Sequence, residues 1–241
     1  MRIFTDPMEM IKEVERDLFE MGTIYQSDTC QDKIVTFDPN YQTKELFGYA
    51  YMLTDFPEDR LEEMVTYTGY LEGKNNWVDA EVNERLFDSF DISAPPNPGD
   101  SWRQNSDLWG PFLRNGCFSY SYAERWRAQL PYIIRELQTK PNTRQTVMTM
   151  YDRHEDMMNW GGRDRVPCSI SYQFGIREDR LIVIYSQRSC DFIKFFAADV
   201  YFTIRLLQYV ASAIGREPGQ FIHFLGSLHA FQGDLLKRGI F

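Results

Sequence analysis

The sequence predicts a domain built from both helices and strands, because two kinds of apolar periodicity alternate along the chain. Residues 199–214 carry apolar side chains on one helical face, whereas residues 168–174 alternate roughly between apolar and polar, as a strand does. A charged turn at residues 177–180 leads into a second apolar run at residues 181–185. With 241 residues and 43% hydrophobic content, the chain can form one large domain, residues 1–241, with a substantial core.

The first expected helix has clear signals at both ends. Asp6 can cap it, Pro7 suits its first position, Glu9 completes a capping box, and Gly22 ends it. Residues 89–116 are rich in Pro, Asn, Asp and Gly and predict a long loop, a feature that is commonly functional in compact domains. The other expected elements are strands at 33–37 and 46–53, helices at 57–73 and 122–137, a polar loop at 152–165, the strand pair and helix named above, and a strand at 221–225.

The composition excludes several classes of protein. A formal net charge of −9, with no basic stretch, provides no electrostatic surface for nucleic acid. The N-terminus has no apolar signal region, and no apolar run approaches a membrane span. Four scattered cysteines are too few for a disulfide scaffold, and no Cys or His spacing suggests zinc. We therefore expect a soluble, cytoplasmic protein with reduced thiols, no metal, and no nucleic-acid or membrane partner.

The strand pair carries the residues with the clearest chemistry. Cys168 follows Pro167, and a cysteine in a tight proline turn at the end of a strand can be presented to a cleft. Arg188 follows the partner strand, where it can hold a phosphate, or lower the pKa of the thiol and so supply a nucleophilic thiolate. The alternative is that Cys168 is a small apolar core residue.

The order Pro167-Cys168, strand pair, and Gln-Arg-Ser-Cys-Asp at residues 187–191 resembles the thymidylate synthase superfamily. Ser169, where thymidylate synthases usually have His, and the sequence Gly-Ser-Leu-His at 226–229 are more similar to the phage-type (deoxy)cytidylate 5-hydroxymethylases. The resemblance covers about the C-terminal third well and the rest in pieces. It implies an α/β (α+β) fold with a large mixed sheet, flanked by helices, that forms a homodimer through the sheet.

The resemblance also implies a covalent mechanism. Cys168 would add to C6 of the pyrimidine of a nucleoside monophosphate, because C5 of a neutral pyrimidine is a poor nucleophile without such an adduct. Glu63, early in the expected helix at 57–73, would act as the general acid–base group, with Glu62 as the competing choice. Tyr122 matches a family tyrosine near the ordered water of the active site. On the alternative interpretation, both glutamates are solvent-facing helix residues.

Phosphate binding would combine residues from two chains. The resemblance assigns Arg188 and Ser189 to the phosphate in the same chain, and Arg144 to the phosphate of the other protomer. Gln145 stands where the family has a second arginine, and it lacks the charge and the forked geometry of that residue.

The nucleoside would be recognised by residues near the C-terminus. Asp199 occupies the family position that reads the pyrimidine edge, where thymidylate synthases have Asn and relatives acting on cytosine have Asp. A carboxyl group that shares a proton with N3 complements cytosine, although Asp199 could instead be a helix N-cap. Gln187 is expected to contact the substrate, and His229 would hold the ribose. Phe231 replaces a family tyrosine that binds the sugar.

The implied co-substrate is 5,10-methylenetetrahydrofolate, with Trp102 lining the pyrimidine and folate cleft and Asp191 facing the folate. Two departures bear on this site: Phe195 replaces a favoured Gly, and no family-type tail follows Phe231. The leading hypothesis is a CMP or dCMP 5-hydroxymethylase. The alternatives are a methyl-forming enzyme, including thymidylate synthase itself, and a nucleotide-binding paralogue without folate chemistry.

Overall fold

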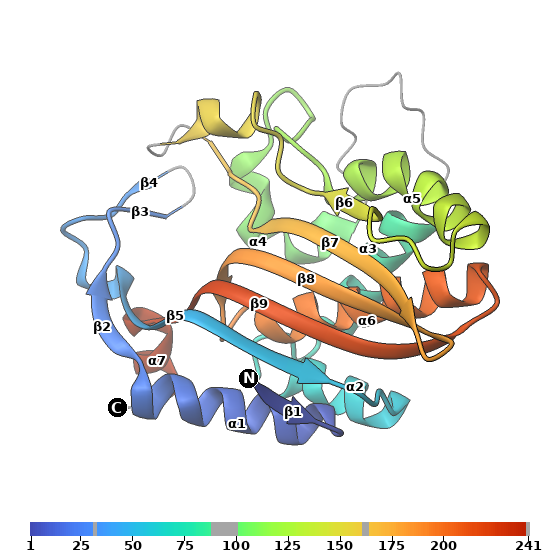
Figure 1. Cartoon of the computed structure of the whole chain (residues 1–241). Coiled ribbons are helices and arrows are strands. Elements are labelled where there is room, and N and C mark those ends of the chain that lie inside the picture. The colour runs from blue at the N-terminus through green and yellow to red at the C-terminus, as the bar shows by residue number, and fades with distance from the viewer. Residues whose placement is uncertain (31–32, 88–100, 161–163, 240–241) are drawn as a thin grey trace.

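In this computed structural model, which describes residues 1–30, 33–87, 101–160 and 164–239, a large mixed sheet forms the centre of the chain (Figure 1). Its described strands run in the order β1-β5-β9-β8-β7-β6, with β2 paired to β5 outside this path and β3 paired to β4 separately. The β1–β5 and β8–β9 pairs are parallel and the other pairs are antiparallel. The strands are β1 Arg2–Phe4, β2 Thr23–Gln26, β3 Thr29–Cys30, β4 Lys33–Ile34, β5 Gln42–Leu53, β6 Val147–Thr149, β7 Ser169–Arg177, β8 Arg180–Asp191 and β9 Glu217–Phe231.

Helices cover one face of this sheet. Figure 1 shows α3, α5 and α6 behind the long strands, and α1 runs along β5 and β1. This arrangement confirms the predicted α/β class with a large mixed sheet flanked by helices. The α-helices are α1 Pro7–Met21, α2 Glu58–Thr66, α3 Asn75–Leu86, α4 Ser106–Trp109, α5 Tyr122–Thr139, α6 Phe196–Ala213 and α7 Gln232–Lys237, and short 3-10 turns lie at Pro39–Tyr41, Ser101–Asn105, Gly110–Phe112 and Asp156–Asn159.

The core lies between the covered face and α6. Inward-pointing rings from three strands, Tyr51, Tyr185 and Phe221, are fully buried with Phe196 of α6. On the opposite face, Phe224 of β9 alternates with the buried His223 and Leu225 and is 46% exposed, and the paired Ile184 and Ile222 are partly exposed. A sheet that buries one face and exposes rings on the other has an unpartnered apolar surface.

The predicted first helix is confirmed at its N-terminus. The Asp6 carboxylate accepts a hydrogen bond from the backbone N–H of Glu9 at 2.7 Å, and Pro7 is the first helical residue. Helix α6 ends where Gly215 adopts a φ of +66°, a left-handed conformation that glycine takes without strain.

Several expected boundaries differ in the structure. The strand expected at 33–37 is only Lys33–Ile34, because it pairs with the two-residue β3 alone. The helix expected at 57–73 ends at Thr66, and Gly69 and Gly73, both with positive φ, make turns after it. Helix α3 was not expected, since its inward face includes the charged Arg85 and so breaks the apolar period.

The long loop expected at 89–116 lies partly outside the described residues, which resume at 101 with a run of short helices. The polar loop expected at 152–165 includes residues 161–163, which also lie outside the described part of the chain.

Candidate active site

A cavity of about 1200 Å³ opens beside the ends of β7, β8 and β9. Its other walls come from α3, from the segment that begins at residue 101, and from the β3–β4 hairpin. Ligand pockets commonly measure about 300–1,000 Å³, so this cavity has room for two ligands side by side. The residues of the predicted site that line it are Trp102, Tyr122, Cys168, Gln187, Arg188, Ser189, Asp191, Asp199 and His229.

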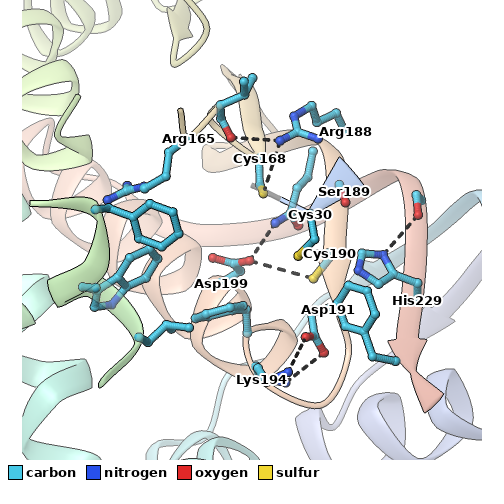
Figure 2. Close-up of a pocket in the computed structure, with 18 of the residues that line it drawn as sticks. Cys30, Arg165, Cys168, Arg188, Ser189, Cys190, Asp191, Lys194, Asp199 and His229 are labelled. Atoms are coloured by element: carbon cyan, nitrogen blue, oxygen red, sulfur yellow. Dashed lines mark hydrogen bonds and ion pairs between the residues drawn. The ribbon is translucent and has the colours of Figure 1, made fainter. Parts of the chain in front are cut away.

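Cys168 directly precedes β7, and Arg188 lies opposite it near the C-terminal end of β8 (Figure 2). The Arg188 guanidinium donates to the carbonyl oxygens of Pro167 at 2.8 Å and Val166 at 2.9 Å, and its Nη2 lies 3.9 Å from Cys168 Sγ. A Cβ at Gly226 would lie 2.6 Å from the Arg188 carbonyl oxygen, so only glycine lets β9 approach here. The cation is therefore held beside the sulfur by backbone contacts.

Burial and charge act in opposite directions on the Cys168 thiol. Burial raises its pKa above the ordinary value, and Arg188 lowers it, with burial the larger cause. The sequence offered two roles for Arg188, holding a phosphate or lowering the pKa of the thiol. The structure places Arg188 beside the thiol, where it does lower that pKa, but desolvation disfavours the thiolate more than one guanidinium favours it.

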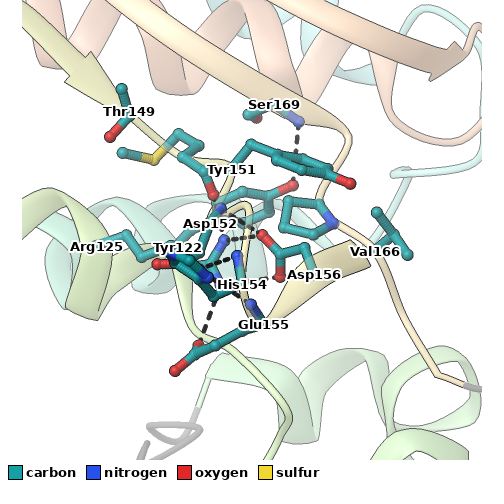
Figure 3. A network of polar contacts seen from close by, with 12 residues as sticks. Tyr122, Arg125, Thr149, Tyr151, Asp152, His154, Glu155, Asp156, Val166 and Ser169 are labelled. Carbon is teal, nitrogen blue, oxygen red and sulfur yellow. Dashed lines mark hydrogen bonds and ion pairs between the residues drawn. The ribbon is translucent and has the colours of Figure 1, made fainter. Parts of the chain in front are cut away.

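Tyr122 fixes the backbone next to the thiol. Its hydroxyl oxygen accepts hydrogen bonds from the N–H groups of Cys168 at 2.9 Å and Ser169 at 3.3 Å (Figure 3). Burial raises the pKa of this tyrosine well above its ordinary value, so it stays protonated and keeps a hydroxyl hydrogen to donate. The tyrosine thus reaches the turn that carries Cys168.

A buried ion pair between Arg125 of α5 and Asp156 holds the segment 150–160. Arg125 donates to both carboxylate oxygens of Asp156, at 2.8 and 3.0 Å, and Asp156 also accepts from the backbone N–H of Asp152 (Figure 3). This segment brings Tyr151 and Trp160 to the cavity, where the Trp160 indole N–H donates to the Tyr151 hydroxyl at 2.7 Å.

Asp199 is a cavity residue and not a helix cap. Helix α6 has Phe195 at its N-cap, which places Asp199 in the first turn. Gln187 Nε2 donates to Asp199 Oδ2 at 2.6 Å, and Cys190 Sγ lies 3.8 Å from the same oxygen. Burial raises the pKa of Asp199 to about 6, against the lowering effects of Gln187 and Arg85. The carboxyl group can therefore gain or lose a proton near neutral pH.

The parallel β8–β9 register places the remaining strand residues together. Ser189 is paired with Ser227, and Asp191 is paired with His229. The Ser227 hydroxyl lies 3.1 Å from His229 Nδ1, and burial lowers the pKa of this histidine, so it is neutral at pH 7. Asp191 accepts from the backbone N–H of Ile193 at 3.0 Å, which orients its carboxylate.

Trp102 lines the opposite wall from the turn Ser101–Asn105. Its ring makes an edge contact with Phe118 at 6.0 Å, and its indole N–H is buried without a hydrogen-bond partner among the described residues. Phe195 and Phe231 also line the cavity, so both departures from the family pattern lie at the site. Phe195 packs against Trp109, with ring centroids 5.8 Å apart.

Glu63, predicted to be the catalytic carboxylate, does not reach the cavity, and this assignment needs correction. Helix α2 turns Leu61 and Met64 into the core, so Glu62 and Glu63 both fall on its exposed side. The Glu63 side chain is 51% exposed and pairs with Arg60. The apolar stripe of the helix, which the sequence contains, decides this orientation.

Helix α3 supplies the carboxylates that the sequence reasoning missed. Glu81 and Glu84 line the cavity, and the Ser101 hydroxyl lies 2.7 Å from an oxygen of each. Arg85 is 5% exposed, donates to Glu81 at 2.9 Å, and packs 4.8 Å from the Tyr122 ring. The i, i+3 and i+4 spacing of these charges was the available signal, and their burial was not visible in it.

Arg165 is a second missed residue, three positions before Cys168. Its guanidinium is surrounded by aromatic rings, including Tyr120 at 4.5 Å and Trp109 at 4.6 Å, and the side chain lines the cavity. Its Nε is buried without a partner in the described part of the chain. Arg165 also lowers the pKa of the Cys168 thiol, less than Arg188 does.

Arg144 lies outside the cavity lining, exposed in the turn between α5 and β6. Its predicted role involves a second copy of the chain and stays a prediction. Among the described residues, no group of three His, Cys, Asp or Glu side chains could hold a metal ion, and no helix is long and apolar enough to cross a membrane.

Comparison with known proteins gives a consistent result. The family model described as thymidylate synthase matches residues 70–237. Putative thymidylate synthases of Methanosarcina acetivorans and Methanocaldococcus jannaschii are 32% identical over 124 residues and 30% identical over 115 residues. These matches cover 48% and 47% of this chain and 55% and 52% of the relatives, so the chain spans about half the length of the curated relatives it matches. The crystal structure of thymidylate synthase from T4 phage shares the fold, with a TM-score of 0.60 and 19% identity over 94% of this chain and 78% of that one.

Proposed function

Because the chain belongs to the thymidylate synthase family, we propose that it transfers a one-carbon unit from 5,10-methylenetetrahydrofolate to C5 of a cytosine nucleoside monophosphate, giving the 5-hydroxymethyl product. The observation that carries this proposal is the meeting of Cys168, Arg188 and Asp199 at one cavity. They supply a nucleophile, a cation beside it, and a carboxyl group that can complement cytosine.

Cys168 is the proposed nucleophile, and its sulfur would bond to C6 of the pyrimidine. Its raised pKa means that the free enzyme holds a thiol, so the proton must leave before or during attack. Arg188 and Arg165 both favour the thiolate. The Tyr122 hydroxyl accepts hydrogen bonds from the N–H groups of Cys168 and Ser169 and so holds the backbone that carries the sulfur.

Glu81 replaces Glu63 in the proposed mechanism as the general acid–base group. It lines the cavity, lies near enough to Asp199 to raise the pKa of that carboxyl, and is held by Arg85 and Ser101. A carboxylate held in this way can move a proton at C5 or at a leaving group, which typically contributes about 10²–10⁴-fold in rate.

The nucleotide is proposed to lie along the strand wall. Arg188 and Ser189 would hold the phosphate, His229 the ribose hydroxyl, and Asp199 with Gln187 the pyrimidine edge. Because the Asp199 pKa is about 6, this carboxyl can share a proton with N3 of cytosine at neutral pH. An ionised Asp199 facing O4 of uracil would be repelled.

The helical wall fits a flat aromatic co-substrate. Trp102 and Trp109 line this wall with large aromatic side chains, against which a flat ring can pack. When bound, methylenetetrahydrofolate would supply the one-carbon unit, and Asp191 is proposed to face it. The volume of about 1200 Å³ accommodates both molecules.

A homodimer through the uncovered sheet face is part of the proposal. Phe224 is 46% exposed on that face, and burying this ring against a second copy is favourable. Arg144, exposed in each chain, would then complete the phosphate site of the other protomer.

A methyl-forming enzyme is the second candidate, acting on a cytosine or a uracil nucleotide. It is favoured by the description of the curated relatives as putative thymidylate synthases. A nucleotide-binding protein without folate chemistry is the third, favoured by the presence of Phe195 and Phe231 at the cavity.

Incubation with C5-tritiated dCMP or dUMP and methylenetetrahydrofolate separates these candidates. Tritium release with dCMP and a 5-hydroxymethyl product in the mass spectrum are the expected results. A methyl product would favour the second candidate. No tritium release, with nucleotide binding retained, would favour the third.

A further inference from the structure

A row of four polar side chains runs from the middle of the sheet to Asp199. The Tyr51 hydroxyl lies 3.0 Å from His223 Nδ1, His223 Nε2 lies 3.0 Å from Gln187 Oε1, and Gln187 Nε2 donates to Asp199 Oδ2 at 2.6 Å. Tyr51 and His223 are both fully buried, and neither lines the cavity. We refer to Tyr51, His223, Gln187 and Asp199 as the relay.

The chemistry of the relay permits one direction of donation. Burial lowers the pKa of His223 to about 3, so the ring is neutral and carries a single N–H. Burial raises the pKa of Tyr51 well above its ordinary value, and its hydroxyl has no other acceptor within the described residues, so it donates to Nδ1. His223 Nε2 then carries the hydrogen and donates to the Gln187 oxygen, which leaves the Gln187 NH₂ for Asp199.

Packing prevents the His223 ring from turning over. The ring is stacked on Tyr185, with centroids 4.7 Å apart and planes 16° apart, and Tyr51 meets its edge at 5.4 Å. Phe221 covers it from a further side at 5.4 Å. Exchanging the two ring nitrogens would require moving close-packed aromatic neighbours, so Nδ1 stays with Tyr51 and Nε2 stays with Gln187.

The relay makes the two oxygens of Asp199 unequal. Oδ2 already accepts an N–H of Gln187 and cannot donate there, whereas Oδ1 has no hydrogen-bond partner among the described residues. The cytosine edge presents an acceptor beside a donor, and the uracil edge presents them in the reverse order. A carboxyl group with unequal oxygens matches one of these edges better, whereas one free to protonate on either oxygen matches both.

We propose that Tyr51 and His223 are positioning residues that determine which pyrimidine the site accepts, by holding Asp199 Oδ2 as an acceptor through Gln187. The inference rests on the proposed function, because it requires a pyrimidine at Asp199. It adds two residues that contact neither the ligand nor the cavity.

The test measures binding, so it does not depend on turnover. Dissociation constants for dCMP and dUMP are measured by calorimetry for the wild type, Tyr51→Phe and His223→Phe. Each variant keeps a ring in the core. His223→Phe removes the donor to the Gln187 oxygen, and Tyr51→Phe removes the hydroxyl that sets which nitrogen of His223 carries the hydrogen. We expect the cytosine-over-uracil ratio to fall about tenfold in both, the equivalent of about 1.4 kcal/mol for one mismatched buried group.

Tyr185→Phe is the matched control, since Tyr185 is equally buried and stacked on His223 but bonds Ser169 instead of the relay. Its ratio should equal that of the wild type, and thermal unfolding checks that each protein is folded. If Tyr51→Phe does not fold, His223→Phe alone decides the result.

A wild type that prefers dCMP, with an unchanged ratio in the folded relay variants, overturns the relay and leaves the proposed function standing. A ratio that falls equally in Tyr185→Phe also overturns it, since general loosening of the core would then explain the effect. A wild type that prefers dUMP, or binds neither nucleotide, overturns the proposed cytosine specificity itself.

Discussion

The two walls of the cavity are held in different ways. On the strand wall, Cys168, Arg188 and His229 are positioned by backbone ladders between β7, β8 and β9. On the helical wall, side chains hold one another, as when Ser101 bonds to Glu81 and Glu84. A ladder persists when a side chain is replaced, whereas a side-chain pair does not. Substitutions on the strand wall should therefore change chemistry without moving the backbone, and substitutions on the helical wall should change both.

Cys168→Ser tests the strand wall with the largest expected effect. Turnover should be abolished because a serine hydroxyl does not ionise near neutral pH, while the ladder that carries the residue stays intact. Tritium release measures the loss, and calorimetry with dCMP should show binding close to that of the wild type. Retained tritium release in Cys168→Ser would show that Cys168 is not the nucleophile.

Glu81→Gln tests the helical wall. We expect turnover to fall about 10²–10⁴-fold, as when a general acid–base group is removed, with some loss of thermal stability because Arg85 loses its charged partner. Glu63→Gln is the matched control, and it should resemble the wild type because its side chain is exposed on α2. Loss of turnover in Glu63→Gln but not in Glu81→Gln would show that Glu63 of α2, and not Glu81, is the general acid–base group.

Asp199→Asn probes the residue that spans both walls, since it is bonded to Gln187 on the strand side and lies near Arg85 on the helical side. The cytosine-over-uracil ratio of kcat/KM should narrow or reverse, by about ten- to a hundredfold, because an amide can present a donor to O4 and an acceptor to N3–H. A wild type that prefers uracil, or a variant with an unchanged ratio, would show that Asp199 does not recognise the base.

The same carboxyl predicts a pH dependence. Its pKa of about 6 lies above the ordinary value because burial disfavours the charged form. Below that pH, Asp199 already carries the proton that it shares with N3. Above that pH, binding of a cytosine nucleotide must take up a proton from solvent, so the affinity for dCMP should fall about tenfold per pH unit. Calorimetry with dCMP between pH 5 and 8 measures the slope, which Asp199→Asn should remove.

Arg144→Ala has the smallest expected effect, because this exposed residue would act only across a dimer interface. Loss of one charged contact should weaken dCMP binding about tenfold. At dCMP concentrations well below the dissociation constant, mixing Arg144→Ala with Cys168→Ser should raise the activity to about one quarter of the wild-type value, because half of the dimers are mixed and one site in each mixed dimer carries neither change. No recovery, with subunit exchange confirmed, would show that the site is not shared.

Local signals determined much of the strand wall from the sequence. The alternation in residues 168–174, the charged turn and the apolar run at 181–185 specify a hairpin, and a hairpin necessarily brings Cys168 and Arg188 close together. Helix α1 was equally predictable, because Asp6 and Glu9 lie within one turn of each other and need no distant partner.

Only the tertiary structure decided which carboxylates face the cavity. The exposure of Glu63 follows from the apolar stripe of α2, which the sequence contains, but the inward position of Glu81 depends on its ion pair with the buried Arg85. The raised pKa of Asp199 has the same origin, because it depends on the neighbours that exclude water. Helix caps and strand alternation depend on a few consecutive residues and can be predicted from the sequence. Burial and charge pairing depend on residues far apart in the chain and cannot.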